Sequence, residues 1–145
     1  MNLSGTEHFD APVERVFDQI TNLEFTAKTL PGVERVEKLE PKHLECRVKP
    51  GFSFLTGSMQ MTFDVLEAER PTSAKMRVKG KGIGASVTIE TSVHLTAEGT
   101  GTRLDWSSEV TELGGLIKAV SRALIEGAAK KIVSDSWGTF RKHLA

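Results

Sequence analysis

The chain of 145 residues carries 19 lysines and arginines against 19 aspartates and glutamates, so it has no net charge at pH 7. Without net charge there is no long-range field to gather nucleic acid or an anionic membrane, and we expect no nucleic-acid partner. The length suits one domain over residues 1–145, and the single cysteine, Cys46, excludes an internal disulfide.

The N-terminal segment predicts a strand followed by two short helices. The strand ends before Asp10, which we expect to cap a helix with Pro12 in its first turn and apolar residues at helical spacing over 13–20. Asn22 starts a second helical stretch, and the Pro-Gly pair at 31–32 ends it. The chain therefore enters its main part through two short helices.

From Val33 onward apolar and polar residues alternate, which is typical of strands with one buried face. Turn-forming pieces such as PK, PG, RPTS and EGTGT separate the alternating segments. The predicted strands cover residues 33–40, 43–49, 54–69, 74–82, 85–98 and 102–112. With the first strand they predict an antiparallel sheet of about seven strands that has one apolar face.

The inward side of these strands includes three methionines, whose unbranched side chains adapt to irregular shapes. The inward residues that we expect to line a binding pocket are Met59, Met61, Phe63, Met76, Val78, Ile89, Thr91, Trp106 and Ser108. The outward side carries a basic row of Lys75, Arg77, Lys79 and Lys81. We interpret this row as a solvated surface, because no outward aromatic side chain accompanies it for stacking on bases.

After Gly115 the helical period returns and predicts one long helix that continues to the C-terminus. It is the only element long enough to cover the apolar face of the sheet. A turn of about 100° per residue places these residues inward: Ile117, Val120, Ser121, Leu124, Ala128 and Ile132. We therefore expect the sheet to curl around this helix.

Small residues interrupt the inward face of the predicted helix at Gly127 and Ala128. One interpretation is a close crossing between the helix and a strand, and the other is a cavity. The methionines and Gly80 on the facing wall favour a cavity that accepts an apolar molecule. The helix would then contribute Val120, Leu124, Gly127 and Ala128 to the site.

Five segments carry a resemblance to a known family: APVERVF (11–17), TLPGVERVEKLE (29–40), KGKGIGAS (79–86), GTRLDWSSEV (101–110) and ELGGLIKAVSRALIEGAAKKI (112–132). They resemble the CoxG family of carbon monoxide dehydrogenase subunits, a branch of the SRPBCC or START-like helix-grip superfamily. The resemblance implies an α+β helix-grip fold, in which the long C-terminal helix lies over the concave apolar face of the sheet above a deep pocket. It also implies a role beside molybdenum-containing carbon monoxide dehydrogenases, in their maturation or their attachment to the membrane and its quinones.

On these grounds we expect a non-catalytic protein that needs no cofactor and binds an elongated apolar ligand, such as a lipid or a quinone. A molybdenum hydroxylase or carbon monoxide dehydrogenase is the expected partner. Glu7 shares the parity of Leu3 and Phe9, so it is the one acidic residue that we place toward the pocket. The alternative is a small enzyme of the aromatase/cyclase or isomerase type, with Glu7 and Ser108 acting on a bound ring. The four histidines are scattered, and no metal-ligand spacing is present.

The sequence also makes predictions about location. The opening MNLSGTEHFD has neither the basic nor the long apolar region of a signal peptide, which favours the cytoplasm. The outer side of the final helix is charged, the chain ends in FRKHLA, and only Trp137 and Phe140 offer aromatic groups near that end. We therefore expect no stable direct membrane anchoring.

Overall fold

The computed structural model describes residues 2–49, 57–82 and 84–144, except for the side chains of residues 116 and 117. The predicted strand residues 54–56 and the side chain of Ile117 lie outside this described part. The elements are β1 (Asn2–Phe9), α1 (Val13–Ile20), α2 (Leu23–Thr29), β2 (Val33–Glu40), β3 (His43–Val48), β4 (Met59–Glu69), β5 (Ser73–Gly82), β6 (Ala85–Glu98), β7 (Gly101–Gly115), the 3-10 helix η1 (Leu116–Ala119) and α3 (Arg122–Leu144).

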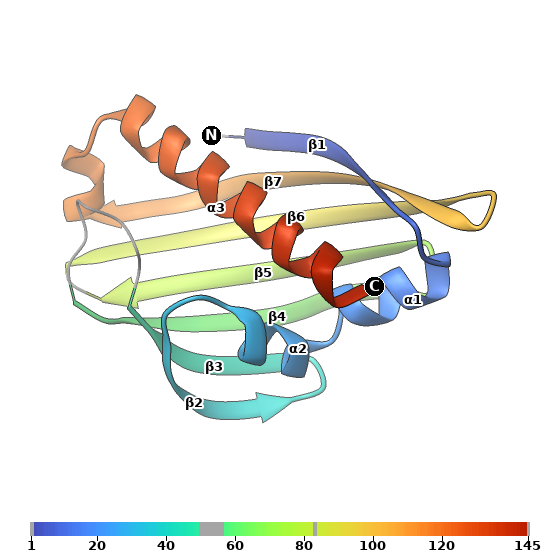
Figure 1. Cartoon of the computed structure of the whole chain (residues 1–145). Coiled ribbons are helices and arrows are strands. Elements are labelled where there is room, and N and C mark those ends of the chain that lie inside the picture. Colours follow the sequence, from blue (N-terminus) through green and yellow to red (C-terminus); the bar gives the residue numbers. More distant parts are fainter. Residues whose placement is uncertain (1, 50–56, 83, 145) are drawn as a thin grey trace.

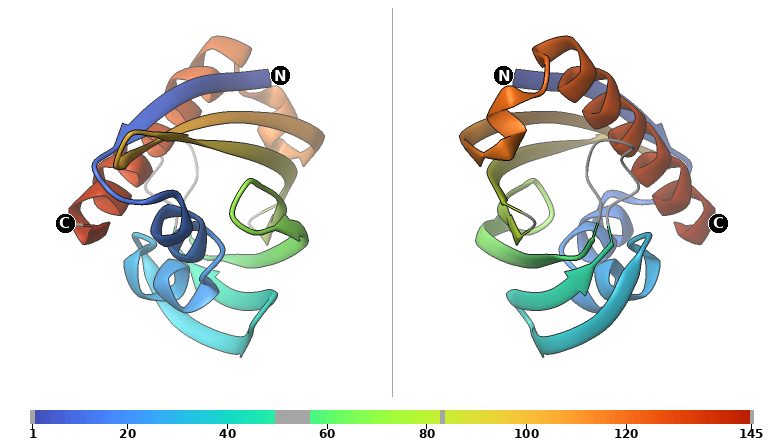
Figure 2. Two further views of the ribbon diagram at one scale, coloured as in Figure 1. Left: turned by 90° about the vertical axis from the view of Figure 1, so that its right-hand side faces the viewer. Right: turned by 90° about the vertical axis from the view of Figure 1, so that its left-hand side faces the viewer.

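The strands form one antiparallel sheet of seven strands in the order β1-β7-β6-β5-β4-β3-β2. The long helix α3 crosses one face of this sheet obliquely (Figure 1). Seen end-on, the sheet is an arc with α1 and α2 on its concave side, and α3 closes the open side next to β1 (Figure 2). The predicted α+β fold, with two short helices after the first strand and a long helix over a curved sheet, is confirmed.

The period-two pattern places the strand side chains on the predicted faces. Leu44 and Cys46 have no exposed surface, while the intervening Glu45 is partly exposed. Across the sheet, Leu44 pairs with Phe63, which pairs with Val78, which in turn pairs with Ile89. Because paired residues of neighbouring strands share a face, these residues form one apolar row along the concave side.

The predicted start of the second helix at Asn22 is correct. The Asn22 side chain accepts hydrogen bonds from the backbone N–H groups of Glu24 and Phe25, at 3.0 and 3.3 Å, and so caps α2. The predicted cap at Asp10 is wrong, because α1 begins at Val13 and its N-cap is Pro12, with no side-chain cap bond. Asp10 lies two residues too early in the chain to act as the N-cap.

The C-terminal helix begins later than predicted. Strand β7 continues to Gly115, which pairs with Ala85 of β6 and has a φ of +72°. This left-handed conformation favours glycine and ends the strand. After η1, Ser121 accepts a hydrogen bond from the backbone N–H of Leu124 at 3.2 Å, so it caps α3 and does not contribute to its inward face.

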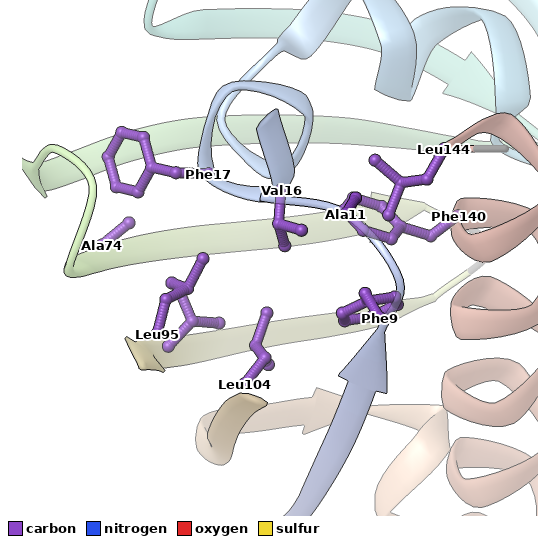
Figure 3. Packing of buried hydrophobic residues seen from close by; sticks show 10 residues of the cluster. Phe9, Ala11, Val16, Phe17, Ala74, Leu95, Leu104, Phe140 and Leu144 are labelled. Atoms are coloured by element: carbon purple, nitrogen blue, oxygen red, sulfur yellow. The ribbon is translucent and has the colours of Figure 1, made fainter. Parts of the chain in front are cut away.

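The last turns of α3 are fixed to the sheet by a cluster of buried apolar residues (Figure 3). Phe140 and Leu144 of α3 are 6% exposed and meet Phe9 of β1 and Val16 of α1 there. The rings of Phe9 and Phe140 pack edge to face, with centroids 5.3 Å apart. The C-terminal end of α3 is therefore the end that sets its position on the sheet.

The predicted inward face of α3 is wrong over its first half. Leu124 and Ile132 are predicted to face the sheet, but they are 48% and 45% exposed. Ile125 instead packs against the cluster of Met59 and Ala85. Because the C-terminal end anchors the helix, its inward face is turned by about one residue, or roughly 100°, from the predicted one.

Candidate functional site

A half-open pocket of about 290 Å³ lies between the concave face of the sheet and the helices; we call it the inner cavity. Its apolar lining residues are Ile20, Leu23, Phe25, Leu30, Phe63, Met76, Val78, Trp137 and Phe140. Three parts of the chain supply them: α1 with α2 and the residues after it, strands β4 and β5, and the C-terminal half of α3. The cavity therefore lies where the resemblance to the helix-grip fold predicts a pocket.

The strand wall of the inner cavity combines the apolar Phe63, Met76 and Val78 with the polar Asp64, Arg77 and Thr91. Met76 of β5 pairs with Thr91 of β6, and Thr91 pairs with Ser108 of β7. The hydroxyl oxygens of Thr91 and Ser108 are 2.7 Å apart and hydrogen bond to each other. Because each hydroxyl already has a hydrogen-bond partner, a ligand does not need to hydrogen bond with this part of the wall.

Aromatic rings of α3 close the inner cavity on the side opposite the sheet. Trp137 lies 5.6 Å from Phe140, 5.9 Å from Phe9 and 6.4 Å from Trp106, measured between ring centroids. These separations are typical of packed aromatic pairs. The site prediction missed Trp137, although its spacing of three residues from Phe140 places both rings on neighbouring positions of one helix.

The predicted ligand-binding residues fall into two groups. Phe63, Met76, Val78 and Thr91 line the inner cavity. The others lie outside that lining: Met59, Met61, Ile89, Trp106, Ser108, Val120, Leu124, Gly127 and Ala128. Helices α1 and α2 supply lining residues that the sequence prediction did not include, because periodicity identifies a helix's apolar face but not the element it meets.

Gly127 matches neither interpretation given to it. It is exposed, and a β-carbon added there would have no atom within 4 Å. The helix therefore makes no close strand crossing at Gly127, and this residue does not border the inner cavity.

Glu7 does not reach the inner cavity. It lies in a second depression of about 550 Å³ between β1 and α3, which we call the outer groove. Arg141 of α3 donates a hydrogen bond from Nη2 to Glu7 Oε1 at 3.0 Å, and its guanidinium lies 4.9 Å from the ring centroid of Phe9. The outer groove shares Trp137 with the inner cavity, so this ring separates the two.

Each ionisable side chain in the lining of the inner cavity forms an ion pair with another side chain. Asp64 contacts His43 at 2.5 Å, Arg77 lies 3.5 Å from Glu90, and Asp135 lies 3.2 Å from Lys131.

Two further observations concern the chemistry of the described residues. Among them, no group of three or more His, Cys, Asp or Glu side chains is placed to hold a metal ion. Burial raises the pKa of the Cys46 thiol, which keeps it neutral, and Cys46 does not line either cavity.

None of the helices in the described ranges combines the length and apolar character needed to span a bilayer.

Solved structures with the same fold come from several bacteria. A conserved protein from Geobacillus kaustophilus superimposes with a TM-score of 0.89 at 22% identity, over 99% of this chain and 95% of that one. A protein from Chromobacterium violaceum gives 0.68 at 13% identity, over 99% and 96%. A protein from Thermus thermophilus gives 0.68 at 16% identity, over 99% and 97%. At these identities the likeness is one of fold.

The sequence comparisons identify a family. The model of the CoxG family of carbon monoxide dehydrogenase subunits matches residues 5–145. No curated protein matches the chain.

Proposed function

Because the chain belongs to the CoxG family of carbon monoxide dehydrogenase subunits, we propose that it is a non-catalytic protein that binds an elongated apolar ligand, such as a lipid or a quinone. The inner cavity is the observation that carries this proposal. Its lining is mostly apolar, and it lies between the sheet and α3. Ligand sites in proteins commonly combine such a lining with a few polar groups.

The size of the inner cavity narrows the ligand class. Its volume of about 290 Å³ is at the lower end of the range of about 300–1,000 Å³ common for ligand sites. A slender chain or a single ring fits this volume better than a large fused ring system. The adaptable side chain of Met76 suits a ligand without fixed polar contacts.

The positions of the candidate catalytic groups support binding over catalysis. An enzyme of the aromatase/cyclase or isomerase type would need Glu7 and Ser108 to act on one ring. Ser108 pairs with Leu3 in the sheet, four residues from Glu7, so the backbone positions of Ser108 and Glu7 are about 13 Å apart along the strands at the usual rise of about 3.3 Å per residue. Glu7 is also held by Arg141, and the Ser108 hydroxyl by Thr91.

Family membership also supports a proposed partner, a molybdenum-containing enzyme of the carbon monoxide dehydrogenase type. We expect affinity purification of the tagged protein from its native host to recover the subunits of such an enzyme. A cytoplasmic location stays a prediction from the sequence.

Native mass spectrometry after gentle extraction tests the binding function, because a retained apolar molecule adds its mass to the protein. Uptake of an apolar fluorophore by the purified protein is the second measurement. The informative variant is Val78→Phe, which adds volume inside the lining of the inner cavity. The matched control is Val87→Phe, at a partly buried position on the same face of the sheet but outside that lining.

We expect Val78→Phe to lower fluorophore uptake at least about tenfold, because the added ring occupies ligand space, while Val87→Phe keeps it. Circular dichroism establishes that both variants are folded. A folded wild-type protein that takes up no fluorophore and carries no extra mass would contradict the proposed function.

A further inference from the structure

The outer groove runs between the edge strand β1 and the second half of α3, on the far side of Trp137 from the inner cavity. The two elements that form it lie side by side in both orientations (Figures 1 and 2). With a volume of about 550 Å³ it is the larger depression, and its lining mixes apolar and polar side chains. Leu3, Val133 and Trp137 supply the apolar part.

Charge distinguishes the outer groove from the inner cavity. Its ionisable lining residues are Lys130, Arg141 and Glu7, which are two cations and one carboxylate. Among the described residues Lys130 forms no ion pair, whereas Arg141 is paired with Glu7. In the inner cavity the ionisable lining residues Asp64, Asp135 and Arg77 are each paired with another side chain. An anionic group is therefore favoured in the outer groove, beside Lys130, which is unpaired among the described residues.

A buried donor borders the outer groove as well. Trp106 contributes to the lining, and its indole Nε1 is buried without a hydrogen-bond partner among the described residues. A buried N–H group that lacks an acceptor is destabilising, and such groups are uncommon in folded proteins. Because Nε1 is buried and lies against the backbone of Gly5, a ligand in the groove reaches it only if the indole ring moves. The observation that favours an anionic group in the groove is therefore Lys130, which is unpaired within the described part of the chain.

We propose that the outer groove binds the carboxylate head of an amphiphile, whose apolar chain passes Trp137 into the inner cavity. The head group meets Lys130, and the chain meets the apolar lining beyond the ring. Trp137 must turn aside for the chain to pass, because it borders both spaces. The proposal rests on the binding function proposed above and adds a ligand class, the long-chain carboxylic acids.

The test compares cis-parinaric acid, a fluorescent fatty acid, with its uncharged methyl ester. Trp106 and Trp137 are the two tryptophans of the chain, and Trp137 borders both spaces, so energy transfer from them to the probe reports binding to the protein in either space. The informative variant is Lys130→Gln. The matched control is Lys131→Gln, which changes the adjacent lysine outside the lining.

We expect the wild-type protein to bind the acid about tenfold more tightly than the ester, on the scale of one charge-assisted hydrogen bond. Lys130→Gln removes this preference and leaves ester binding unchanged, and Lys131→Gln preserves it. Equal binding of acid and ester, or a preference that survives Lys130→Gln, overturns the head-group assignment while the inner cavity remains a ligand site. Binding of neither probe overturns the proposed function as well.

Competition by sodium acetate separates a head-group site from a site for free small anions. We expect millimolar acetate to leave the bound fatty acid in place, because the chain supplies much of the affinity. Full displacement by acetate overturns the assignment to amphiphiles.

Discussion

The indole ring of Trp106 lies against the backbone of Gly5 on the neighbouring strand. The two residues pair directly between β1 and β7, and a β-carbon added at Gly5 would come within 2.9 Å of Cζ2 of the ring. The missing side chain at Gly5 therefore makes room for the indole that borders the outer groove.

Gly5→Ala should displace this ring. An added methyl group at 2.9 Å cannot be accommodated without movement, and overpacking of this kind costs about 1–3 kcal/mol. We expect a lower free energy of unfolding in urea and a shifted tryptophan emission maximum. Unchanged stability together with unchanged emission would contradict the observed packing.

Gly127→Ala is the control for Gly5→Ala, because an added methyl group at Gly127 clashes with nothing. The residue lies inside α3, is exposed, and has no atom within 4 Å of an added β-carbon. Alanine is favoured over glycine within a helix by about 1 kcal/mol, so we expect the free energy of unfolding to rise by roughly that amount. Loss of stability in urea denaturation would show that Gly127 packs against another part of the protein.

His43 should make stability depend on pH. Its Nδ1 lies 2.5 Å from Asp64 and its Nε2 2.7 Å from Glu45, and these hydrogen-bonded carboxylates, Asp64 first, raise the pKa of His43 above 6.5. A group whose pKa is higher in the folded state contributes its full stabilisation at pH values below its unfolded-state pKa. This contribution is lost as the pH rises from about 6.5 through the folded-state pKa of His43.

The measurement is the urea midpoint between pH 6 and pH 9 for the wild-type protein and His43→Gln. We expect the wild-type midpoint to fall more steeply with rising pH than that of the variant, since the glutamine at position 43 has no proton to lose in this window. Parallel curves would mean that the contacts of His43 with Asp64 and Glu45 contribute nothing to stability.

The protein alone should not sediment with anionic liposomes at physiological salt. The two aromatic residues near the end of the chain are occupied in the fold: Phe140 is 6% exposed, and Trp137 packs against Phe9 and Trp106. Peripheral membrane binding by a helix needs bulky apolar residues turned outward. Leu124 and Ile132 of α3 are the exposed alternatives.

A double variant, Leu124→Ser with Ile132→Ser, provides the control for this experiment. Co-sedimentation of the wild-type protein that persists at high salt and disappears in the double variant would contradict the prediction. It would identify the exposed side of α3 as a membrane contact.

The strands and their faces could be predicted from the sequence alone. Alternation is a local property, since successive side chains of a strand point to opposite sides whatever the strand packs against. For that reason Leu44 and Cys46 are correctly placed inward, and the predicted bounds of β2 and β6 agree with the structure. Phe63, Met76, Val78 and Thr91 of the cavity wall follow from the same rule.

The side of α3 that faces the sheet and the lining of the cavity depend on tertiary contacts. Apolar residues cover a wide part of the helix surface, with Ile125 about 100° and Phe140 about 160° around the helix from Leu124, and periodicity does not decide which part faces inward. Burial of Phe140 against Phe9 and Val16 turns the side that carries Phe140 toward the sheet. These contacts join residues far apart in the chain, so no local pattern contains them, and the positions of Trp137, Glu7 and the outer groove all depend on that choice.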